Sequence, residues 1–519
     1  MENLLVSSIT LPNKVVHHIY KYYLIEIIFM NFKNWSENII NKTKILHPRN
    51  DNDIKAIIYS AKRLKKHVRV AGSMHSMSPV IVDSYENNIM IISLDSYHRE
   101  SDIIIDHKNM IVTVNAGFKL AALYDELNKH NYLLETQPAS SAFSIGGIVS
   151  MPVHGCRLGS GIIADYVVAM TLIDGACRDI YKSEMSPDFD LYRANYGILG
   201  IVTSVSFKII KVNNIHAITS VFYNIFNDDL KINKDFLNLY FTRIIEKCLK
   251  PDLISYCHCF VDFHGGCLLA VNWIDDVVEY NVKEKYPDES EVYKLQVPEL
   301  FLEKFHKNFR SDSTILYSAG KIARDAIMYN IEKNMRQDRD MFWVDLASRV
   351  HFMSYFIPVH DGNLKLDNLY RALEVVMETV KKFQNQNFNI DLPLDIRFVT
   401  SSDKSKLSPI YNKEKKIVYA ALDLVCTGYS LETDEKRITK HNDEINTLYR
   451  KFFSIVEEQW IALGGVPHSA KVFGFSNEQL DTFNNKSIQT LLSNEIKDEL
   501  RGKYQNIFMN KFITTILQQ

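Results

Sequence analysis

Two short segments rich in glycine and serine constrain what the first part of the chain can form. AGSMHSMSP at 71–79 directly follows a strand-like HVRV, and SIGGIVSMPVHG occupies 144–155. Small residues let a backbone approach a ligand closely and leave its N–H groups free to bind an anion such as a diphosphate. Neither segment contains the G-x-G-x-x-G pattern or a P-loop. The glycines therefore either serve turns alone or form another kind of anion site.

The surrounding sequence predicts an α+β fold up to position 212. Apolar residues recur at helical spacing over 54–65, after a polar NDND that can cap a helix, and over 119–131. Runs rich in Val and Ile and bounded by Gly, Asn or Asp predict strands at 67–72, 88–94, 102–106 and 110–117. We expect a glycine turn at SIGG followed by a strand, and a short helix and a long strand within 188–210.

Beyond position 212 the pattern changes. Glycine becomes rare, and aromatic strand-like runs such as SYCHCFVDF and HFMSYFIPV alternate with helical stretches such as LDNLYRALEVVMETVKKFQ. An antiparallel sheet with helices packed on it, forming a second domain, fits this pattern. From KFFSIVEEQWIALGG, which starts at position 451, the chain returns to helix, continues through VPHSAKVFGF and ends in a helical tail.

Charge and hydropathy exclude several classes of protein. The chain has 60 basic and 62 acidic residues and a formal charge of -2, so nothing indicates a nucleic-acid-binding protein. The apolar run at 20–30 contains Glu26 and is too short to span a bilayer, which needs roughly 20 residues. We predict a soluble, intracellular, cytoplasmic protein. Membrane docking through this run, and a translation start at Met30, stay open.

The seven cysteines are scattered along the chain. In the sequence CHC, Cys257 and Cys259 share one side of a predicted strand and His258 takes the other. No second pair follows at zinc spacing, so we predict buried strand cysteines and no metal site. The pattern favours a reducing compartment without disulfides.

Several motifs in one order resemble FAD-linked oxidases of the vanillyl-alcohol oxidase fold, and within them the sugar-lactone and alditol oxidases. These motifs are NWSENI, HPRNDNDIKAII, VRVAGSMHSMSP, SIGGIVSMPVHG, YGILGIVTSVSFKI, PLDIRFVTSSDKSKLSPIY, VPHSAKVF and YQNIFMNKF. The resemblance implies an N-terminal extension (1–33), a PCMH-type FAD-binding domain (34–212), a substrate or cap domain with an antiparallel sheet (213–455), and a C-terminal segment returning to the FAD-binding domain (456–519).

In that family the first glycine segment wraps the FAD diphosphate, and its histidine is bonded to the flavin. The resemblance implies that His75 is the covalent FAD ligand. It implies that the cofactor-binding residues are Gly72, Ser73, Met74, His75, Ser76, Met77, Ser140, Ser144, Gly147, Met151, Pro152, Val153, His154 and Ile201. Residues 151–154 stand where relatives carry T-G-T-H, and Pro152 removes a backbone donor there.

Oxidation of an alcohol needs groups that hold the hydroxyl and stabilise the developing alkoxide. Asp395 and Arg397 lie two residues apart on a predicted strand, so both project from one face. Spacing alone favours a surface ion pair. The resemblance instead implies that Asp395, Arg397 and Lys471 are the catalytic residues.

Three departures from the family concern the pocket. Asp395 replaces a glutamate, Ser469 replaces a tryptophan, and YAALDLV has no counterpart of a histidine that alditol oxidases keep near the site. We therefore predict a pocket that is larger or differently polar than a lactone pocket.

The resemblance implies an FAD-dependent oxidase that acts on a small alcohol, sugar or lactone and passes electrons to O2, giving H2O2. Two alternatives within the fold are a dehydrogenase with another electron acceptor and a flavin-binding protein without turnover. A protein that keeps the fold without FAD is a weaker alternative. The oligomeric state stays open.

Overall fold

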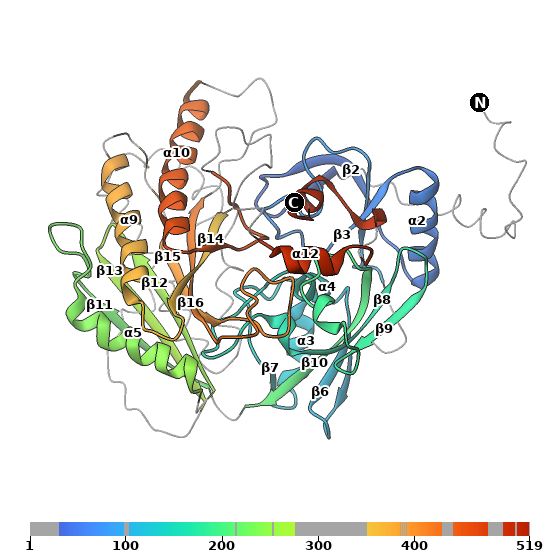
Figure 1. Cartoon of the computed structure of the whole chain (residues 1–519), viewed down its shortest axis with the longest axis horizontal. Helices are drawn as coiled ribbons and strands as arrows, with labels where there is room; N and C mark the ends of the chain where they lie inside the picture. Colours follow the sequence, from blue (N-terminus) through green and yellow to red (C-terminus); the bar gives the residue numbers. More distant parts are fainter. Residues whose placement is uncertain are drawn as a thin grey trace, which may run out of the picture.

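The computed structural model describes residues 31–97, 103–212, 215–251, 254–275, 350–427, 440–475, 491–503 and 506–517, except positions 385, 387, 389 and 391. The apolar run at 20–30 lies outside these residues. The described chain forms three sheets: two smaller ones in one half of the molecule, and a larger one with its helices in the other (Figure 1).

The first sheet has the strand order β1-β2-β4-β3, with β2, β4 and β3 parallel. Its elements are β1 (Asn31–Lys33), β2 (Ile40–Leu46), α2 (Asp51–Arg63), β3 (His67–Ala71) and β4 (Ile89–Ser93). Helix α2 begins where the Asn50 side chain accepts a hydrogen bond from the Asp53 N–H. The cap predicted from NDND is therefore confirmed.

The second sheet has the order β5-β6-β10-β8-β9, and β7 also pairs with β10. Its strands are β5 (Ile103–Asp106), β6 (Ile111–Asn115), β7 (Tyr132–Leu134), β8 (Val167–Ile173), β9 (Asp179–Ser183) and β10 (Ile201–Lys211). The helices between them are α3 (Leu120–Asn128), α4 (Ile145–Ser150), η1 (Ile163–Tyr166) and η2 (Phe189–Leu191).

The glycine turn predicted at SIGG is wrong, because these residues begin helix α4. The first of the two glycines allows close packing instead. A Cβ added to Gly146 would lie 3.3 Å from the Ala116 Cβ, so the helix sits almost directly on the end of β6. Tight tertiary contact outweighs the low helix propensity of glycine here.

The third sheet has seven strands in the order β11-β13-β12-β15-β16-β14-β17, and every neighbouring pair is antiparallel. Its strands are β11 (Ile215–Phe222), β12 (Ser255–Asp262), β13 (Cys267–Asp275), β14 (Val350–His360), β15 (Leu394–Thr400), β16 (Val418–Thr427) and β17 (Val466–Pro467). The helices α5 (Lys234–Leu249), α9 (Leu366–Gln384) and α10 (Lys440–Ala462) cover one face (Figure 1). The predicted α+β fold, with a cap built on an antiparallel sheet, is confirmed.

Strand β12 shows how the two faces of this sheet differ. Cys257 and Cys259 are fully buried in the core under the helices, as predicted for strand cysteines. His258 lies on the opposite face, stacked on Phe260. That face turns toward the two smaller sheets, because Cys156, which follows the second glycine segment, packs against it in a separate cluster with Phe260.

The C-terminal elements pack on the first sheet. They are α12 (Asn494–Leu500), η6 (Asn506–Phe508) and α13 (Lys511–Leu517). Ile496 and Phe512 join Phe32 and Ile91 in one core cluster, and in Figure 1 the red C-terminal helices lie beside the blue strands. The domain boundaries stay a prediction, and α10 continues through position 455.

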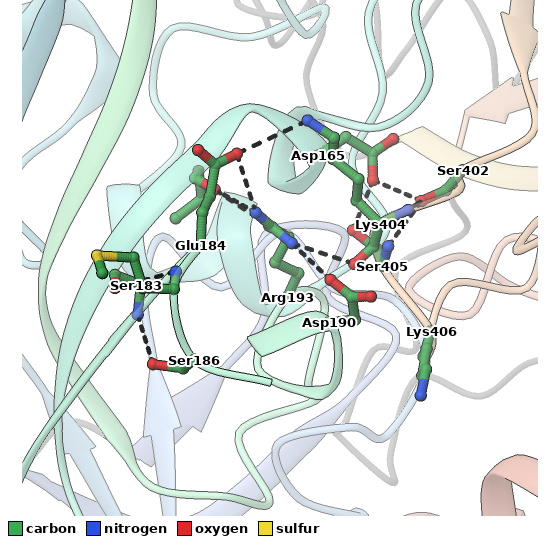
Figure 2. Close-up of polar contacts among 12 residues, drawn as sticks. Asp165, Ser183, Glu184, Ser186, Asp190, Arg193, Ser402, Lys404, Ser405 and Lys406 are labelled. Atoms are coloured by element: carbon green, nitrogen blue, oxygen red, sulfur yellow. Dashed lines mark hydrogen bonds and ion pairs between the residues drawn. The ribbon is translucent and has the colours of Figure 1, made fainter. Parts of the chain in front are cut away.

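A polar clasp joins the loop between β15 and β16 to the smaller sheets (Figure 2). Asp165, a buried residue of η1, accepts hydrogen bonds from the Ser402 Oγ at 2.5 Å and the Ser405 Oγ at 2.6 Å. Beside it, Arg193 pairs with Asp190 at 2.9 Å and donates to the Lys404 carbonyl oxygen at 3.3 Å. Burial raises the pKa of Asp165 to about 6, against the hydrogen bonds, which favour the carboxylate.

The clasp predicts a pH-dependent effect of the double substitution Ser402→Ala/Ser405→Ala. Because the pKa of Asp165 is raised in the folded state, ionisation of this carboxyl destabilises the fold as pH rises from about 4 to about 6. The two serine hydroxyls reduce this destabilisation because they donate hydrogen bonds to the ionised form. We expect the double variant to lose about 2 to 4 kcal/mol at pH 7.5 and clearly less at pH 4.5, where Asp165 is neutral. Thermal unfolding at the two pH values measures this.

The control is Ser401→Ala, which removes a hydroxyl of the same loop that bonds to the Lys415 carbonyl oxygen instead. It should show no such pH dependence. An equal loss at both pH values for the double variant would contradict an ionised Asp165 in the clasp.

Candidate active site

One cavity connects the two glycine segments with the face of the third sheet that turns away from α5, α9 and α10. With its opening to solvent it encloses about 1490 Å³ of space free of atoms. The predicted site residues that line it are Gly72, Ser73, Met74, His75, Ser76, Met77, Ser144, Gly147, Met151, Val153, His154, Arg397 and Lys471. The structure thus brings segments far apart in the sequence to one place.

Four predicted residues lie outside the lining: Ser140, Pro152, Ile201 and Asp395. Ser140 is fully buried, and its hydroxyl accepts a hydrogen bond from the Ala142 N–H. The Ile201 side chain belongs to the core of the second sheet, whereas the preceding Gly200 lines the cavity.

The segment NWSENI donates three hydrogen bonds to carbonyl oxygens of the first glycine loop. The three contacts are Asn34 Nδ2 to Ser76 O at 2.9 Å, Trp35 N to Met74 O at 2.9 Å, and Asn38 Nδ2 to Met77 O at 2.8 Å. These bonds occupy three carbonyl oxygens of the loop. Within the described part of the chain, the N–H groups of Ser73, Met74 and Ser76 have no protein acceptor. The loop therefore offers donors to an anion.

The backbone of this loop is conformationally costly at one position. Met74 has φ of 58°, in the left-handed region that residues with a Cβ rarely adopt. Two residues earlier, a Cβ added to Gly72 would lie 1.9 Å from the Ser144 Oγ, so Ser144 would have to move. The two glycine segments thus touch each other, and strain is concentrated where a ligand would bind.

Two aromatic rings hold the His75 imidazole. Trp35 stacks on it with a centroid distance of 4.8 Å and an interplanar angle of 20°, and Phe143 meets it edge-on at 4.8 Å and 75°. Trp35 and Phe143 also line the cavity. The histidine is therefore held in one orientation beside an aromatic wall.

A row of buried polar side chains crosses four strands at the other end of the cavity. Its contacts are His258 Nε2 with Asp395 Oδ1, Asp395 Oδ2 with Arg397 Nε at 3.6 Å, Arg397 Nη2 with Asp423 Oδ2, and Ser354 Oγ with Asp423 Oδ1. Asp395 and Asp423 lie directly opposite each other on β15 and β16. One guanidinium thus lies between two carboxylates.

The two carboxylates face different surroundings. Asp395 is fully buried and bonded to His258, away from the cavity lining. Asp423 lines the cavity together with Arg397 and Lys471. Sequence reasoning missed Asp423, although a single charged residue in the apolar run IVYAALDLVC is a usable signal.

Burial and the charges of neighbouring side chains set the protonation states of the titratable groups at the cap end of the cavity. Burial raises the pKa of Asp423, but the Arg397 and Lys471 cations outweigh it and hold the pKa well below its usual range. Burial lowers the pKa of Lys471 to about 8. Burial and the Lys471 charge lower the pKa of His468 to about 3, and burial and Arg397 lower that of His154 well below its usual value. At neutral pH both imidazoles are uncharged.

These features fit FAD. The N–H groups of Ser73, Met74 and Ser76 suit a diphosphate, and the aromatic wall around His75 suits a flat ring. The cations at the far end suit an oxyanion that develops next to the ring. The residues of the cavity therefore match the parts of the cofactor in order.

Residues 43–178 match the family model described as FAD binding domain. The chain contains an FAD-binding domain of this family. The match includes both glycine segments and His75. Residues of these segments line one end of the cavity, which we call the nucleotide end.

Curated relatives are distant. The chain is 27% identical to the mouse (Mus musculus) L-gulonolactone oxidase over 183 residues, covering 34% of this chain and 40% of that protein. It is 25% identical to the D-arabinono-1,4-lactone oxidase of Eremothecium gossypii over 227 residues, covering 42% of each. The chain thus aligns with about two fifths of the length of these relatives.

Solved structures share the fold across nearly the whole chain. The cholesterol oxidase from B. sterolicum superimposes with a TM-score of 0.71 at 14% identity, covering 98% of both chains. A solvent-stable cholesterol oxidase gives a TM-score of 0.67 at 14% identity, covering 94% of this chain and 97% of that one. At this identity the likeness shows the fold alone.

In the part of the chain that the structure describes, no helix combines the length and apolar character needed to cross a membrane. The same residues contain no group of three or more His, Cys, Asp or Glu side chains arranged for a metal ion.

The hydrogen bonds from NWSENI to the glycine loop predict that Asn34→Ala and Asn38→Ala each lower cofactor retention. Loss of an amide donor frees a loop carbonyl, so the N–H groups are no longer fixed toward the cavity. We expect FAD binding to weaken by about tenfold, the value of one or two hydrogen bonds. The ratio of flavin to protein after purification and dialysis measures this in a His75→Ala background, where no covalent bond to this histidine can hold the flavin.

Lys33→Ala in the same background is the matched control, since Lys33 is exposed and its ammonium pairs with Glu37. It should retain FAD as the background protein does. Full flavin content in both asparagine variants would show that the loop holds its shape without NWSENI.

Proposed function

We propose that this protein is an FAD-dependent oxidoreductase that oxidises a CH–OH group of a polyol, sugar or sugar lactone, with O2 as acceptor. One observation carries the proposal: a single cavity joins the FAD-binding loops to the buried group of Arg397, Asp423 and Lys471. The lactone oxidases among the distant relatives support CH–OH oxidation.

Bound FAD would supply a two-electron acceptor for the substrate hydride, and O2 would regenerate it with release of H2O2. The loop 72–77, Ser144 and Gly147 would hold the cofactor. We propose that His75 bonds covalently to it, since the rings of Trp35 and Phe143 hold the imidazole in a fixed orientation on the cavity wall.

The cap residues would act on the substrate hydroxyl. The Lys471 ammonium lies 4.1 Å from the centre of the Phe352 ring and, with the Arg397 guanidinium, gives this end positive charge that stabilises a developing alkoxide. The Asp423 carboxylate can accept a hydrogen bond from a neighbouring substrate hydroxyl. Asp395 does not line the cavity, so we propose that it positions Arg397 rather than touching substrate.

The end of the cavity that holds Arg397, Asp423 and Lys471 is close to neutral in charge. Arg397 and Lys471 are balanced by Asp395 and Asp423, and the two imidazoles are uncharged. Such a site favours an uncharged substrate with several hydroxyls over a carboxylate, which would need an unbalanced cation.

Ser469, which stands where the family has a tryptophan, is fully buried, and its hydroxyl accepts a hydrogen bond from the Tyr196 hydroxyl at 3.0 Å.

The first test separates cofactor chemistry from substrate chemistry. We expect acid-precipitated protein to retain yellow flavin, and His75→Ala to release it into the supernatant. We expect the holoenzyme to lose its flavin colour under anaerobic conditions with at least one polyol, sugar or lactone, and to form H2O2 when air is admitted. Flavin that no alcohol reduces would contradict the proposed activity, and flavin released from the unmodified protein would contradict the covalent bond alone.

The role of Lys471 predicts the pH dependence of flavin reduction. Its pKa is lowered to about 8, so the ammonium is present below this value and is lost above it. We expect the anaerobic reduction rate to fall as pH rises through about 8. Lys471→Arg should abolish this fall because a guanidinium stays charged. Lys471→Met should reduce the rate about 100-fold or more below pH 8, and its own rate should not fall through pH 8. A rate that instead rises through pH 8 would make Lys471 a base.

A further inference from the structure

Lys119 reaches the cavity beside the first glycine loop. It immediately precedes α3, lines the cavity, and its ammonium donates a hydrogen bond to the Ser73 Oγ at 2.8 Å. The Ser73 hydroxyl in turn donates to the Ala142 carbonyl oxygen, next to the second glycine segment. The ammonium therefore stands where the two segments meet.

Among the described residues, no carboxylate forms an ion pair with the Lys119 ammonium. Its hydrogen bond goes to the neutral hydroxyl of Ser73. Burial lowers the pKa of Lys119, and Asp95 offsets this only through longer-range attraction. A partly buried cation without a counter-ion is unfavourable unless an anion joins it.

The other cations of the cavity are engaged elsewhere. Arg397 lies between its two carboxylates, and Lys471 lies over Phe352 at the substrate end. The Arg69 guanidinium is buried and donates to the carbonyl oxygens of Val80, Tyr196 and Phe508. At the glycine loop, Lys119 is thus the cation that an anion can recruit.

The N–H groups of the same loop supply the remaining donors. Those of Ser73, Met74 and Ser76 have no acceptor in the described part of the chain, and Ser73 is also the residue that Lys119 contacts. A cation and several N–H groups around one point form the donor set for a phosphate or diphosphate ester.

We propose that Lys119 binds the diphosphate of FAD and makes the cavity select the dinucleotide over riboflavin. This inference rests on the proposed function only in taking FAD as the cofactor. Lys119 contributes affinity through its charge, and its bond to Ser73 keeps the ammonium against the loop when the cofactor is absent.

The test measures reversible binding, so it uses the full chain with His75→Ala, from which any covalent bond is removed. In this background, Lys119→Met keeps the length of the side chain and removes the charge, whereas Lys119→Arg keeps the charge. Ser73→Ala removes the hydroxyl and leaves the ammonium. Lys129→Met is the matched control, because Lys129 at the other end of α3 is exposed and paired with Glu126.

Dissociation constants for FAD and riboflavin are measured by flavin fluorescence at low and high salt. We expect Lys119→Met to weaken FAD binding by about 10- to 100-fold, the range of a charge-assisted hydrogen bond. Riboflavin binding should be almost unchanged, since it has no phosphate. The FAD dissociation constants of Lys119→Arg and Lys129→Met should stay near that of the His75→Ala background. Lys119→Met should also reduce the salt dependence of FAD binding. This salt dependence can be measured even if riboflavin binds too weakly for its dissociation constant to be determined.

Three results would overturn the inference. Unchanged FAD affinity in Lys119→Met would show that the charge has no part in binding. Two other outcomes would show that Lys119 only positions the loop. In one, the salt dependence is unchanged, and Ser73→Ala and Lys119→Met weaken FAD binding equally. In the other, Lys119→Met weakens the binding of FAD and of riboflavin equally. If even the unmodified protein binds no FAD, the proposed function fails together with this inference, and that outcome is recognisable before any Lys119 variant is made.

Discussion

The guanidinium of Arg397 is the interaction on which the cap side of the cavity depends. Buried carboxylates are unfavourable without a partner, and Arg397 pairs with two of them, Asp395 beside it on β15 and Asp423 on β16. His258 and Ser354 complete the row from β12 and β14. Backbone pairing holds these four strands together, and one charge links their buried polar side chains. The cavity wall therefore has a defined shape as well as a defined polarity.

At the nucleotide end of the cavity, hydrogen bonds to the backbone set the shape of the first glycine loop. NWSENI binds carbonyl oxygens of the first glycine loop from outside, and the loop N–H groups are left for a ligand. Glycine at 72 lets the second segment come into contact, and the left-handed Met74 is maintained by these surroundings. A rigid anion site and a charged wall therefore lie at opposite ends of one space.

The sequence predicts much of this arrangement, because strand alternation and motif order are local properties. Alternation alone placed His258 opposite Cys257 and Cys259, and the α+β organisation follows from hydrophobic period. It could not show that SIGG is helical, since the packing of Gly146 on Ala116 is a tertiary contact. Nor could it show that Asp395 turns to His258 and leaves Asp423 at the cavity, because that depends on which strands become neighbours.

The clasp of Figure 2 also concerns the mechanics of the molecule. The strand that carries Arg397 ends at Thr400, whose N–H donates to the Ser160 carbonyl oxygen at 2.8 Å, and the chain then enters the loop held by Asp165. Arg397 is thereby tethered to the FAD-binding half through a short, continuous stretch of backbone. A hinge rotation of the cap would have to break the clasp before it could carry the guanidinium away, so the same contacts limit how far the two halves can separate during a catalytic cycle.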